Sequence, residues 1–280
     1  MSETHEICAI IGSGSIGSSI ARGLVEAKRF PIHDIIMTDR KTHVLEPLAE
    51  KGFITEPDNV AAVKKADIVL IAVEPQHIDD VLAEIGPVLM PGKHLLISVV
   101  SGVTLSQITG QLPNKVTVVR AMPNTAIAIR EAMTCLTMDE DHPKAIETAQ
   151  SIFNAVGKTL VIDEDQMTAA TALGACGIAF FLRAIRAASQ GGIEIGFHSE
   201  AALMIAAQTA KGAASLLQSM ENHPEHEIDR VTTPKGCTIV GLNQMEHEGF
   251  SSAMIKGITT SASKASKLYC SGDTCHLGGG

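Results

Sequence analysis

Two short segments of the sequence have residue types and spacings that suit chemistry on a bound molecule. The first is Gly12-Ser13-Gly14-Ser15-Ile16-Gly17, which directly follows an apolar run and opens a helical pattern. In this context Gly12 allows a tight turn, Gly14 lets the backbone approach a pyrophosphate, and Gly17 allows close packing of helix on strand. N–H groups at the start of that helix suit an anion. The segment predicts a dinucleotide site, and the alternative is a glycine turn without a ligand.

The residues that follow the second expected strand bear on which dinucleotide is bound. They are Thr38-Asp39-Arg40-Lys41. An acid about 20 residues beyond the last glycine suits a ribose 2′-hydroxyl, whereas Arg40 and Lys41 suit a 2′-phosphate. Two cations against one acid, which could turn outward, favour NADP(H) and leave NAD(H) possible. The alternative for the two cations is an exposed pair at a helix start.

The second segment is Val231–Ile239, which reads VTTPKGCTI. Thr233 before Pro234 predicts a helix N-cap followed by proline at the first helical position. The first-turn N–H groups would then form a site for a carboxylate. Gly236 would remove side-chain obstruction there, and Thr238 would add a hydroxyl donor. An ordinary capped helix start is the alternative.

Apolar, β-branched runs alternate with amphipathic helical patterns over the first 162 residues. Strands with almost no polar alternation are buried on both faces, which requires helices on each side of a parallel sheet. The pattern predicts a Rossmann-like, doubly wound α/β domain over residues 1–163. The expected strands are 7–11, 34–38, 67–73, 94–100, 116–120, 133–137 and 159–162, and the expected helices lie near 15–28, 44–51, 77–85 and 145–155.

The pattern changes after residue 163 to Ala-rich segments of helical period, which predict an all-helical domain over 164–280. Small residues crowd these helices and leave wide apolar stripes that one chain does not cover. A homodimer or larger homo-oligomer is therefore expected, and the alternative is that these faces pack against one another within the monomer. The expected helices are 166–192, 199–220, 234–248 and 250–268.

The composition argues against several classes of partner. The formal net charge is −9, with one Tyr and no Trp, which disfavours nucleic acid. No stretch reaches about 18 uninterrupted apolar residues, so a membrane span is not expected. Six scattered cysteines without a CxxC pair, and an N-terminus without the features of a signal peptide, favour a reduced cytoplasm. Cys270, Cys275 and His276 lack a fourth ligand, so no metal site is expected.

Several segments in matching order resemble the pyrroline-5-carboxylate reductases, over essentially the whole chain. They are VTTPKGCTIVGLNQMEHEGF, RAMPNT at 120–125, the helix containing AAQTAKGAASLL, and Glu221 with His223-Pro224. The family signature reads roughly V-T-S-P-G-G-T-T-I-x-x-L followed by L-E-x-x-G-F. The resemblance implies a Rossmann domain and a helical domain that interlocks in a dimer, often assembled into decamers. It also implies NAD(P)H-dependent reduction of 1-pyrroline-5-carboxylate to L-proline, the last step of proline biosynthesis.

The resemblance also implies roles for individual residues. Thr238 would lie beside the ring nitrogen of the substrate, with Glu164, Glu221, Val231, Gly236 and Cys237 around the same pocket. The nicotinamide nucleotide would be lined by Gly12, Ser13, Gly14, Ser15, Ile16, Gly17, Asn59, Val73, Glu74, Pro75 and Asn124. Structural alternatives exist: the two glutamates as solvated helix-end acids, Asn59 as a helix-start residue, and Val73 as plain core.

The chain departs from the family pattern at several positions. Where the family often has V-K-P-Q, an acid, Glu74, replaces a cation beside the cofactor. The family's S-G-P-A-Y contains Cys176 and Ile178 here, the proline after MPNT is Ala126, and two positions of P-G-G-T-T are Lys235 and Cys237. The glycine loop, Gly236 and Thr238 are retained, so these departures are interpreted as tuning within one reaction class.

Two other functions remain open on the residues alone. A β-hydroxyacid dehydrogenase has a similar domain order but requires a base, for which Lys211 in QTAKGAA is the obvious candidate. A non-catalytic nucleotide-binding protein would need the glycine loop but not VTTPKGCT. Imine reduction demands less of the protein, because a protonated imine is already electrophilic and positioning suffices.

Overall fold

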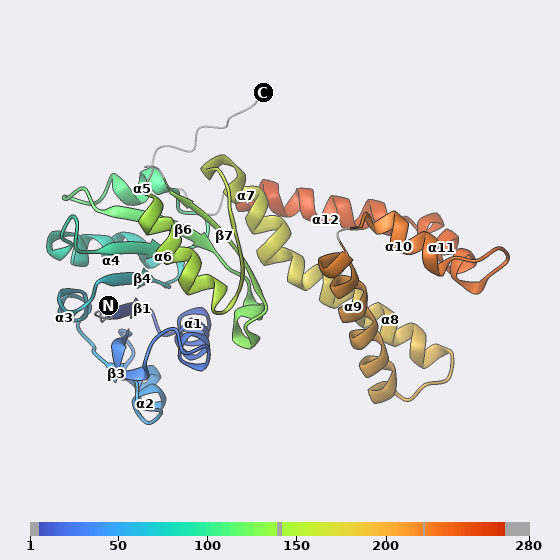
Figure 1. Cartoon of the computed structure of the whole chain (residues 1–280), viewed down its shortest axis with the longest axis horizontal. Helices are drawn as coiled ribbons and strands as arrows, with labels where there is room; N and C mark the ends of the chain where they lie inside the picture. The colour runs from blue at the N-terminus through green and yellow to red at the C-terminus, as the bar shows by residue number, and fades with distance from the viewer. Residues whose placement is uncertain (1–5, 139–141, 221, 267–280) are drawn as a thin grey trace. The chain divides into compact units, whose positions relative to one another are not determined.

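The chain forms two compact units in a computed structural model that describes residues 6–138, 142–220 and 222–266 (Figure 1). The first unit is Met1–Cys176 with Ser261–Gly280, and the second is Gly177–Thr260. The domain boundary expected between residues 163 and 164 falls at the start of a 3-10 helix, Glu164–Gln166. The compact units divide later, after Cys176.

The first unit is built on an eight-stranded sheet in the order β3-β2-β1-β4-β5-β6-β7-β8 (Figure 1). β7 is antiparallel to β6, and every other pair of neighbours is parallel. The strands are β1 Cys8–Ile11, β2 Ile35–Thr38, β3 Ile54–Thr55, β4 Ile68–Ile71, β5 Leu95–Ser98, β6 Thr117–Met122, β7 Ala132–Met138 and β8 Gly157–Val161.

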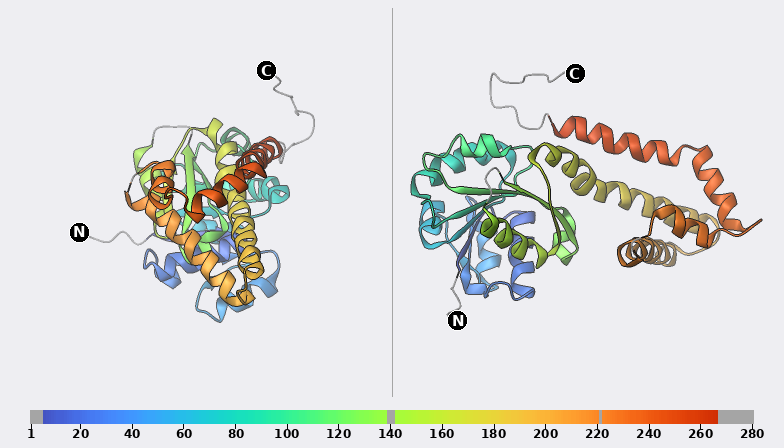
Figure 2. Two further views of the ribbon diagram at one scale, coloured as in Figure 1. Left: turned by 90° about the vertical axis from the view of Figure 1, so that its right-hand side faces the viewer. Right: turned by 45° about the horizontal axis from the view of Figure 1, so that its top comes forward.

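Helices cover both faces of this sheet (Figure 2). They are α1 Ser15–Glu26, α2 Thr42–Ala49, α3 Asn59–Lys65, α4 Ile78–Ile85, α5 Leu105–Thr109 and α6 Pro143–Asn154. Successive strand residues face opposite sides. In β1, Cys8 and Ile10 belong to the buried cluster that includes side chains of α1, α2 and α6. Ala9 and Ile11 belong to the cluster that includes α3, α4 and α5. This arrangement confirms the doubly wound domain predicted from the sequence.

Short elements account for most differences from the expected pattern in this unit. All the expected strands are present, but β3, α3 and α5 were not predicted. The two residues of β3 are too few for periodicity to reveal. α5 does carry a local signal, because Thr104 and Gln107 form a reciprocal capping box at its start.

The helix that follows residue 163 begins in the first unit and is irregular. α7, Met167–Ala170, passes into a π-helix at Thr171–Cys176, where the Asn124 side chain donates to the Gly174 carbonyl at 3.2 Å. The whole stretch Glu164–Glu194 has 31 residues and a mean hydropathy of 1.6 in its most apolar window, long and apolar enough to cross a membrane by length and composition alone. A single such helix is weak support for a membrane span. The expectation that the chain has no membrane-spanning segment therefore stays a prediction.

The second unit is entirely helical where it is described. It contains α8 Gly177–Glu194, α9 Ser199–Met220, α10 Pro224–Val231, α11 Cys237–His247 and α12 Phe250–Ala265 as far as Thr260. α8 and α9 lie side by side (Figure 2), and a Cβ on Gly192 would meet the Cβ of Ala202 at 3.1 Å. Large apolar side chains are nevertheless exposed, including Phe181 at 60% and Met204 at 67%. Wide apolar stripes are thus exposed in the second unit, as the sequence indicated, and the oligomer expected from them stays a prediction.

The expected helix over 234–248 is wrong at its start. The structure has α10, which was not predicted, and α11 begins only at Cys237. The expected end of the last helix at Leu268 lies outside the described residues, as do Glu221, Cys270, Cys275 and His276.

Candidate active site

The glycine loop opens onto a cavity of about 270 Å³ at the carboxyl ends of β1, β2 and β4. The cavity is lined by the glycine loop, the residues after β2 and after β4, the start of α3, and one side of α4. The sheet order reverses at β1, because β2 lies on one side of it and β4 on the other. Ligands of open α/β sheets bind at such a switch point.

The surroundings of the three loop glycines agree with the turn and close packing expected at Gly12 and Gly17, and they leave open space at Gly14. Gly12 has a φ of 97°, and a Cβ there would lie 2.7 Å from the Ala72 carbonyl oxygen. A Cβ on Gly17 would lie 2.0 Å from the Gly12 oxygen, so the helix passes too close for any side chain. A Cβ on Gly14 would meet no atom within 4 Å, and Gly14 lines the cavity.

The start of α1 fits the pyrophosphate of a dinucleotide. Gly14 is the N-cap of α1, and no side chain caps the helix there. The first N–H groups of a helix have no intrahelical acceptor and carry its positive dipole end. Open space beside Gly14 and these donors together form a cradle for an anion.

Asp39 holds the glycine loop rather than turning outward. Its Oδ2 accepts from the backbone N–H of Ser13 at 3.0 Å, and its Oδ1 accepts from that of Lys41 at 2.9 Å. Ser13 is buried, and its hydroxyl donates to the Thr38 carbonyl at 2.9 Å. Both carboxylate oxygens of Asp39 are therefore engaged with the backbone around the cavity.

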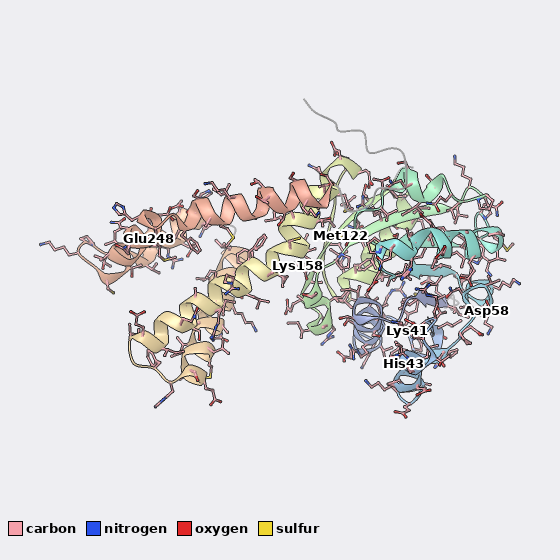
Figure 3. The ribbon with its side chains drawn as sticks, turned by 180° about the vertical axis from the view of Figure 1, so that it is seen from behind. Lys41, His43, Asp58, Met122, Lys158 and Glu248 are labelled. Carbon is pink, nitrogen blue, oxygen red and sulfur yellow. The ribbon has the colours of Figure 1, made fainter. Side chains whose placement is uncertain are left out.

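The cavity contains cations and acids on different elements. Arg40 and Lys41 are exposed and come from the loop after β2; Lys41 is labelled in Figure 3. Glu74 follows β4, where the Gln76 side chain donates to it, and Asp80 and Glu84 lie on α4. The cavity thus offers partners to a phosphate while keeping several carboxylates near it.

The structure places the remaining expected cofactor residues in two groups. Asn59 and Val73 line the cavity with the residues above. Asn124 does not line it: its side chain accepts from the Ala126 N–H and so caps the 3-10 helix Thr125–Ile129. Ser15, Ile16 and Pro75 belong to the lining segments without lining the cavity themselves.

The VTTPKGCT segment forms a turn and then a helix. The Gly236 N–H donates to the Thr233 carbonyl at 2.9 Å, and Lys235 has a φ of 60°. Pro234 and Lys235 are thus the central residues of a β-turn, as proline second and glycine fourth in a turn favour. The N-cap expected at Thr233 is wrong: the N-cap of α11 is Gly236, and Thr238 is the second helical residue.

The other residues expected around the substrate have varied surroundings. Glu164 forms an ion pair with Arg120, with Nη1 and Oε1 2.6 Å apart, and Oε1 also accepts from the Leu105 N–H at 3.1 Å. It is therefore no solvated helix-end acid. Val231 ends α10 with 61% exposure, and Cys237 is an exposed free thiol.

Sequence reasoning missed Arg120 as a partner of Glu164, and it missed Glu84 and Asp80 in the cavity. Arg120 contributed only to the resemblance through RAMPNT. No local signal joins side chains that are tens of residues apart.

Known proteins resemble both halves of the chain. A family model described as pyrroline-5-carboxylate reductase dimerisation matches residues 164–268, and one described as NADP oxidoreductase coenzyme F420-dependent matches residues 7–102. Pyrroline-5-carboxylate reductase 2 of Dictyostelium discoideum is 48% identical over 275 residues, which cover 92% of each chain. The chain belongs to the pyrroline-5-carboxylate reductase family. A solved reductase of that name from Coxiella burnetii is 30% identical, with a TM-score of 0.89 over 96% of this chain and all of that one.

Membership of the pyrroline-5-carboxylate reductase family confirms the resemblance drawn from VTTPKGCTIVGLNQMEHEGF, RAMPNT and the other matching segments. It sets aside the β-hydroxyacid dehydrogenase, whose base would be Lys211. Pyrroline-5-carboxylate reductase 1 of Dictyostelium discoideum is 51% identical over 273 residues, which cover 93% of this chain and 49% of that protein. The chain thus spans about half the length of this relative.

Proposed function

We propose that the chain reduces 1-pyrroline-5-carboxylate to L-proline and prefers NADPH to NADH. The observation that carries the proposal is the coincidence of VTTPKGCT with a glycine loop whose cavity also holds Arg40 and Lys41. Initial rates with 1-pyrroline-5-carboxylate under each reduced cofactor test it directly. A protein that turns over neither combination would contradict it.

The residues of the chain would mainly bind and orient the reactants. Reduced nicotinamide, when bound, supplies a hydride to the imine carbon. The glycine loop and the start of α1 would hold the pyrophosphate, and the free N–H groups of Cys237 and Thr238 at the start of α11 would hold the carboxylate. The Gly236 N–H already donates to the Thr233 carbonyl, so it is not among the groups expected to bind the substrate carboxylate.

The preference for NADPH is supported by the state of Asp39. In an NAD-dependent site, the acid at this position accepts hydrogen bonds from the ribose. Each oxygen of Asp39 accepts one backbone N–H, from Ser13 or Lys41, so the carboxylate is held against the loop with part of its accepting capacity used. Arg40 and Lys41 are the side chains suited to a 2′-phosphate. Glu74 brings negative charge into the same cavity, so NADH remains a usable second cofactor.

Replacing Arg40 by alanine is expected to weaken NADPH binding far more than NADH binding. The loss is about 1.5 to 3 kcal/mol, the range for a hydrogen bond to a charged group, and less where Lys41 compensates. Calorimetric dissociation constants for both cofactors measure it, with Lys51→Ala, an exposed cation outside the cavity, as the control. Equal losses for both cofactors would assign Arg40 a structural role.

Replacing Thr238 by valine is expected to lower the rate of imine reduction about 10-fold to 100-fold, the usual cost of one proton-donating or positioning contact. The substitution preserves shape and removes the hydroxyl that would hydrogen-bond the ring nitrogen. Thr238→Ser is the matched control and should retain most activity. Neither variant should abolish binding of proline or cofactor, because backbone N–H groups hold the carboxylate. Wild-type turnover by Thr238→Val would make this residue part of the helix start only.

The assembly and location are also part of the proposal. The matched dimerisation family and the exposed apolar side chains of the second unit support a homodimer. The resemblance implies further assembly of such dimers into a decamer. The net charge of −9 argues against nucleic acid as a partner, and no membrane partner is proposed. Cys8, Cys135, Cys176 and Cys237 are free thiols, which suits a reducing cytoplasm. Burial raises the pKa of Cys8 to about 12, so this thiol is unreactive.

A further inference from the structure

Three side chains from three elements form a hydrogen-bonded chain that runs from the buried end of β2 to the wall of the cavity beside the glycine loop. Thr38 ends β2, Asn59 begins α3, and Glu84 lies near the end of α4. Thr38 Oγ1 donates to Asn59 Oδ1 at 2.6 Å, and Asn59 Nδ2 donates to Glu84 Oε2 at 2.8 Å. Thr38 is fully buried and Asn59 is 8% exposed, while Asn59 and Glu84 both line the cavity.

The orientation of the Asn59 amide follows from its partners. An ionised carboxylate only accepts hydrogen bonds, so the amide nitrogen must face Glu84 and the carbonyl must face the Thr38 hydroxyl. The amide nitrogen carries two N–H donors, and Glu84 takes one of them. The described residues make no further hydrogen bond to this side chain, so the second donor is available at the cavity wall.

The backbone of Asn59 is fixed as well. Asp58, labelled in Figure 3 at the start of α3, is the N-cap of this helix. Its Oδ1 accepts from the N–H groups of Val60 and Ala61 at 2.8 and 3.1 Å. Backbone capping sets where the Asn59 side chain starts, and Glu84 with Thr38 sets how its amide is turned.

We propose that Glu84 is a positioning residue for the dinucleotide: it holds the Asn59 amide so that the second N–H donates to a hydroxyl or phosphate oxygen in the part of the nucleotide that NADP and NAD share. The inference rests on the proposed function, since the ligand is that function's cofactor. Without the carboxylate, only the Thr38 hydroxyl among the described residues holds the amide. Because a hydroxyl can both donate and accept, it permits either orientation about a broad, nearly two-fold torsion. A flipped amide would present its carbonyl oxygen to oxygen acceptors of the ligand, and the hydrogen bond would be lost.

Glu84 and Arg40 should differ in the cofactors whose binding they affect. Arg40 faces the 2′-phosphate in the proposed function, which only NADP carries. Asn59 and Glu84 serve the part of the ligand that NADP and NAD share. Loss of Glu84 should therefore weaken the binding of both nucleotides by the same factor, whereas loss of Arg40 should weaken NADP binding far more than NAD binding.

The test measures calorimetric dissociation constants of the full-length protein for NADP⁺ and NAD⁺. Glu84 is exposed on α4, so Glu84→Leu should fold, with a thermal midpoint close to that of the wild type. It should weaken both nucleotides about tenfold, since a hydrogen bond contributes up to about 1.5 kcal/mol and 1.4 kcal/mol is tenfold. Glu84→Gln keeps an acceptor oxygen and should stay within about threefold of the wild type. Asp79→Asn, on the same helix but outside the cavity, should bind both nucleotides as the wild type does.

Kinetics and a double variant separate positioning from a structural effect. In Glu84→Leu, KM for NADPH should rise while kcat at saturation stays within about twofold of the wild type. Asn59→Ala combined with Glu84→Leu should bind no more weakly than Asn59→Ala alone, because Glu84 acts only through Asn59. If the losses of binding free energy added in the double variant, or if Glu84→Leu bound both nucleotides with wild-type affinity, the positioning role of Glu84 would be wrong. The proposed function would not be affected by either result. Wild-type protein that binds neither nucleotide would overturn the proposed function and this inference with it.

Discussion

Replacing Gly14 by valine is expected to weaken nucleotide binding at least about 100-fold, or about 2.7 kcal/mol, while the protein stays folded. A Cβ at this position meets no atom of the chain within 4 Å, so the added side chain occupies the space in which the pyrophosphate would lie. The backbone of Gly14 has φ −65° and ψ −167°, which valine adopts without strain. Calorimetry with NADP⁺ and equilibrium unfolding in urea provide the two measurements. The expected loss of stability is at most about 1 kcal/mol, the difference between glycine and an apolar residue at an N-cap.

Gly17→Ala is the informative contrast to Gly14→Val, because the two glycines serve different purposes. A Cβ on Gly17 would lie 2.0 Å from the Gly12 carbonyl oxygen, so the loop and α1 must move apart. Stability and nucleotide affinity should therefore fall together in Gly17→Ala, whereas only affinity should fall in Gly14→Val. Wild-type affinity in a folded Gly14→Val protein would remove the glycine loop from the nucleotide site.

The sheet could be predicted from the sequence because its strands are apolar on both faces. A continuous run of apolar residues such as that of β4 places apolar side chains on both faces of the sheet, and both faces must then be covered by helices. Very short elements cannot be recognised in this way. β3 and α5 contain too few residues for a repeating pattern of apolar positions to be detected. The glycine loop could also be predicted, because three glycines at fixed spacing between a strand and a helix form a local sequence pattern. The Ala72 carbonyl that excludes a side chain at Gly12 comes from a distant part of the chain.

Helix starts marked by proline show where local reasoning reaches its limit. Both His223-Pro224 and Thr233-Pro234 carry a capping residue before proline. The first pair begins α10, and the second begins a turn. Gly236, two residues after Pro234, is the turn signal that outweighs the capping signal. Lys235 has a positive φ at a position where the family pattern has glycine. The replacement is visible in the sequence, but the backbone conformation of Lys235 is not.

Long-range polar pairs could not be predicted at all. The chain of Thr38, Asn59 and Glu84 joins three elements, and Arg120 meets Glu164 across the fold. The spacing of such residues in the sequence carries no signal, because the sheet topology brings them together. The resemblance therefore assigned residues such as Asn59 and Glu164 to binding pockets, but it did not indicate the hydrogen bonds and ion pairs that position their side chains.

The Arg120–Glu164 pair supports the last prediction, which concerns stability. The Arg120 side chain is 5% exposed and that of Glu164 is 29% exposed, and the Glu164 carboxylate also accepts from the first N–H of α5. Removing one partner of a buried pair leaves an uncompensated charge, at a cost of about 3 to 5 kcal/mol.

Glu164→Leu is expected to lower the free energy of unfolding by about 3 kcal/mol, and by more than Arg120→Met does. A buried guanidinium stays charged at any accessible pH, so it suffers most when left alone, whereas Glu164 retains partial contact with water and the Leu105 N–H. The double variant Arg120→Met with Glu164→Leu should be more stable than Glu164→Leu, because two apolar side chains leave no stranded charge. Urea unfolding of the four proteins measures the cycle, with Arg130→Met, whose pairing with Glu26 is exposed, as the control. If the two single losses simply added in the double variant, the pair would not act as a unit, and the anchoring of residue 164 to the sheet would have to come from its neighbours.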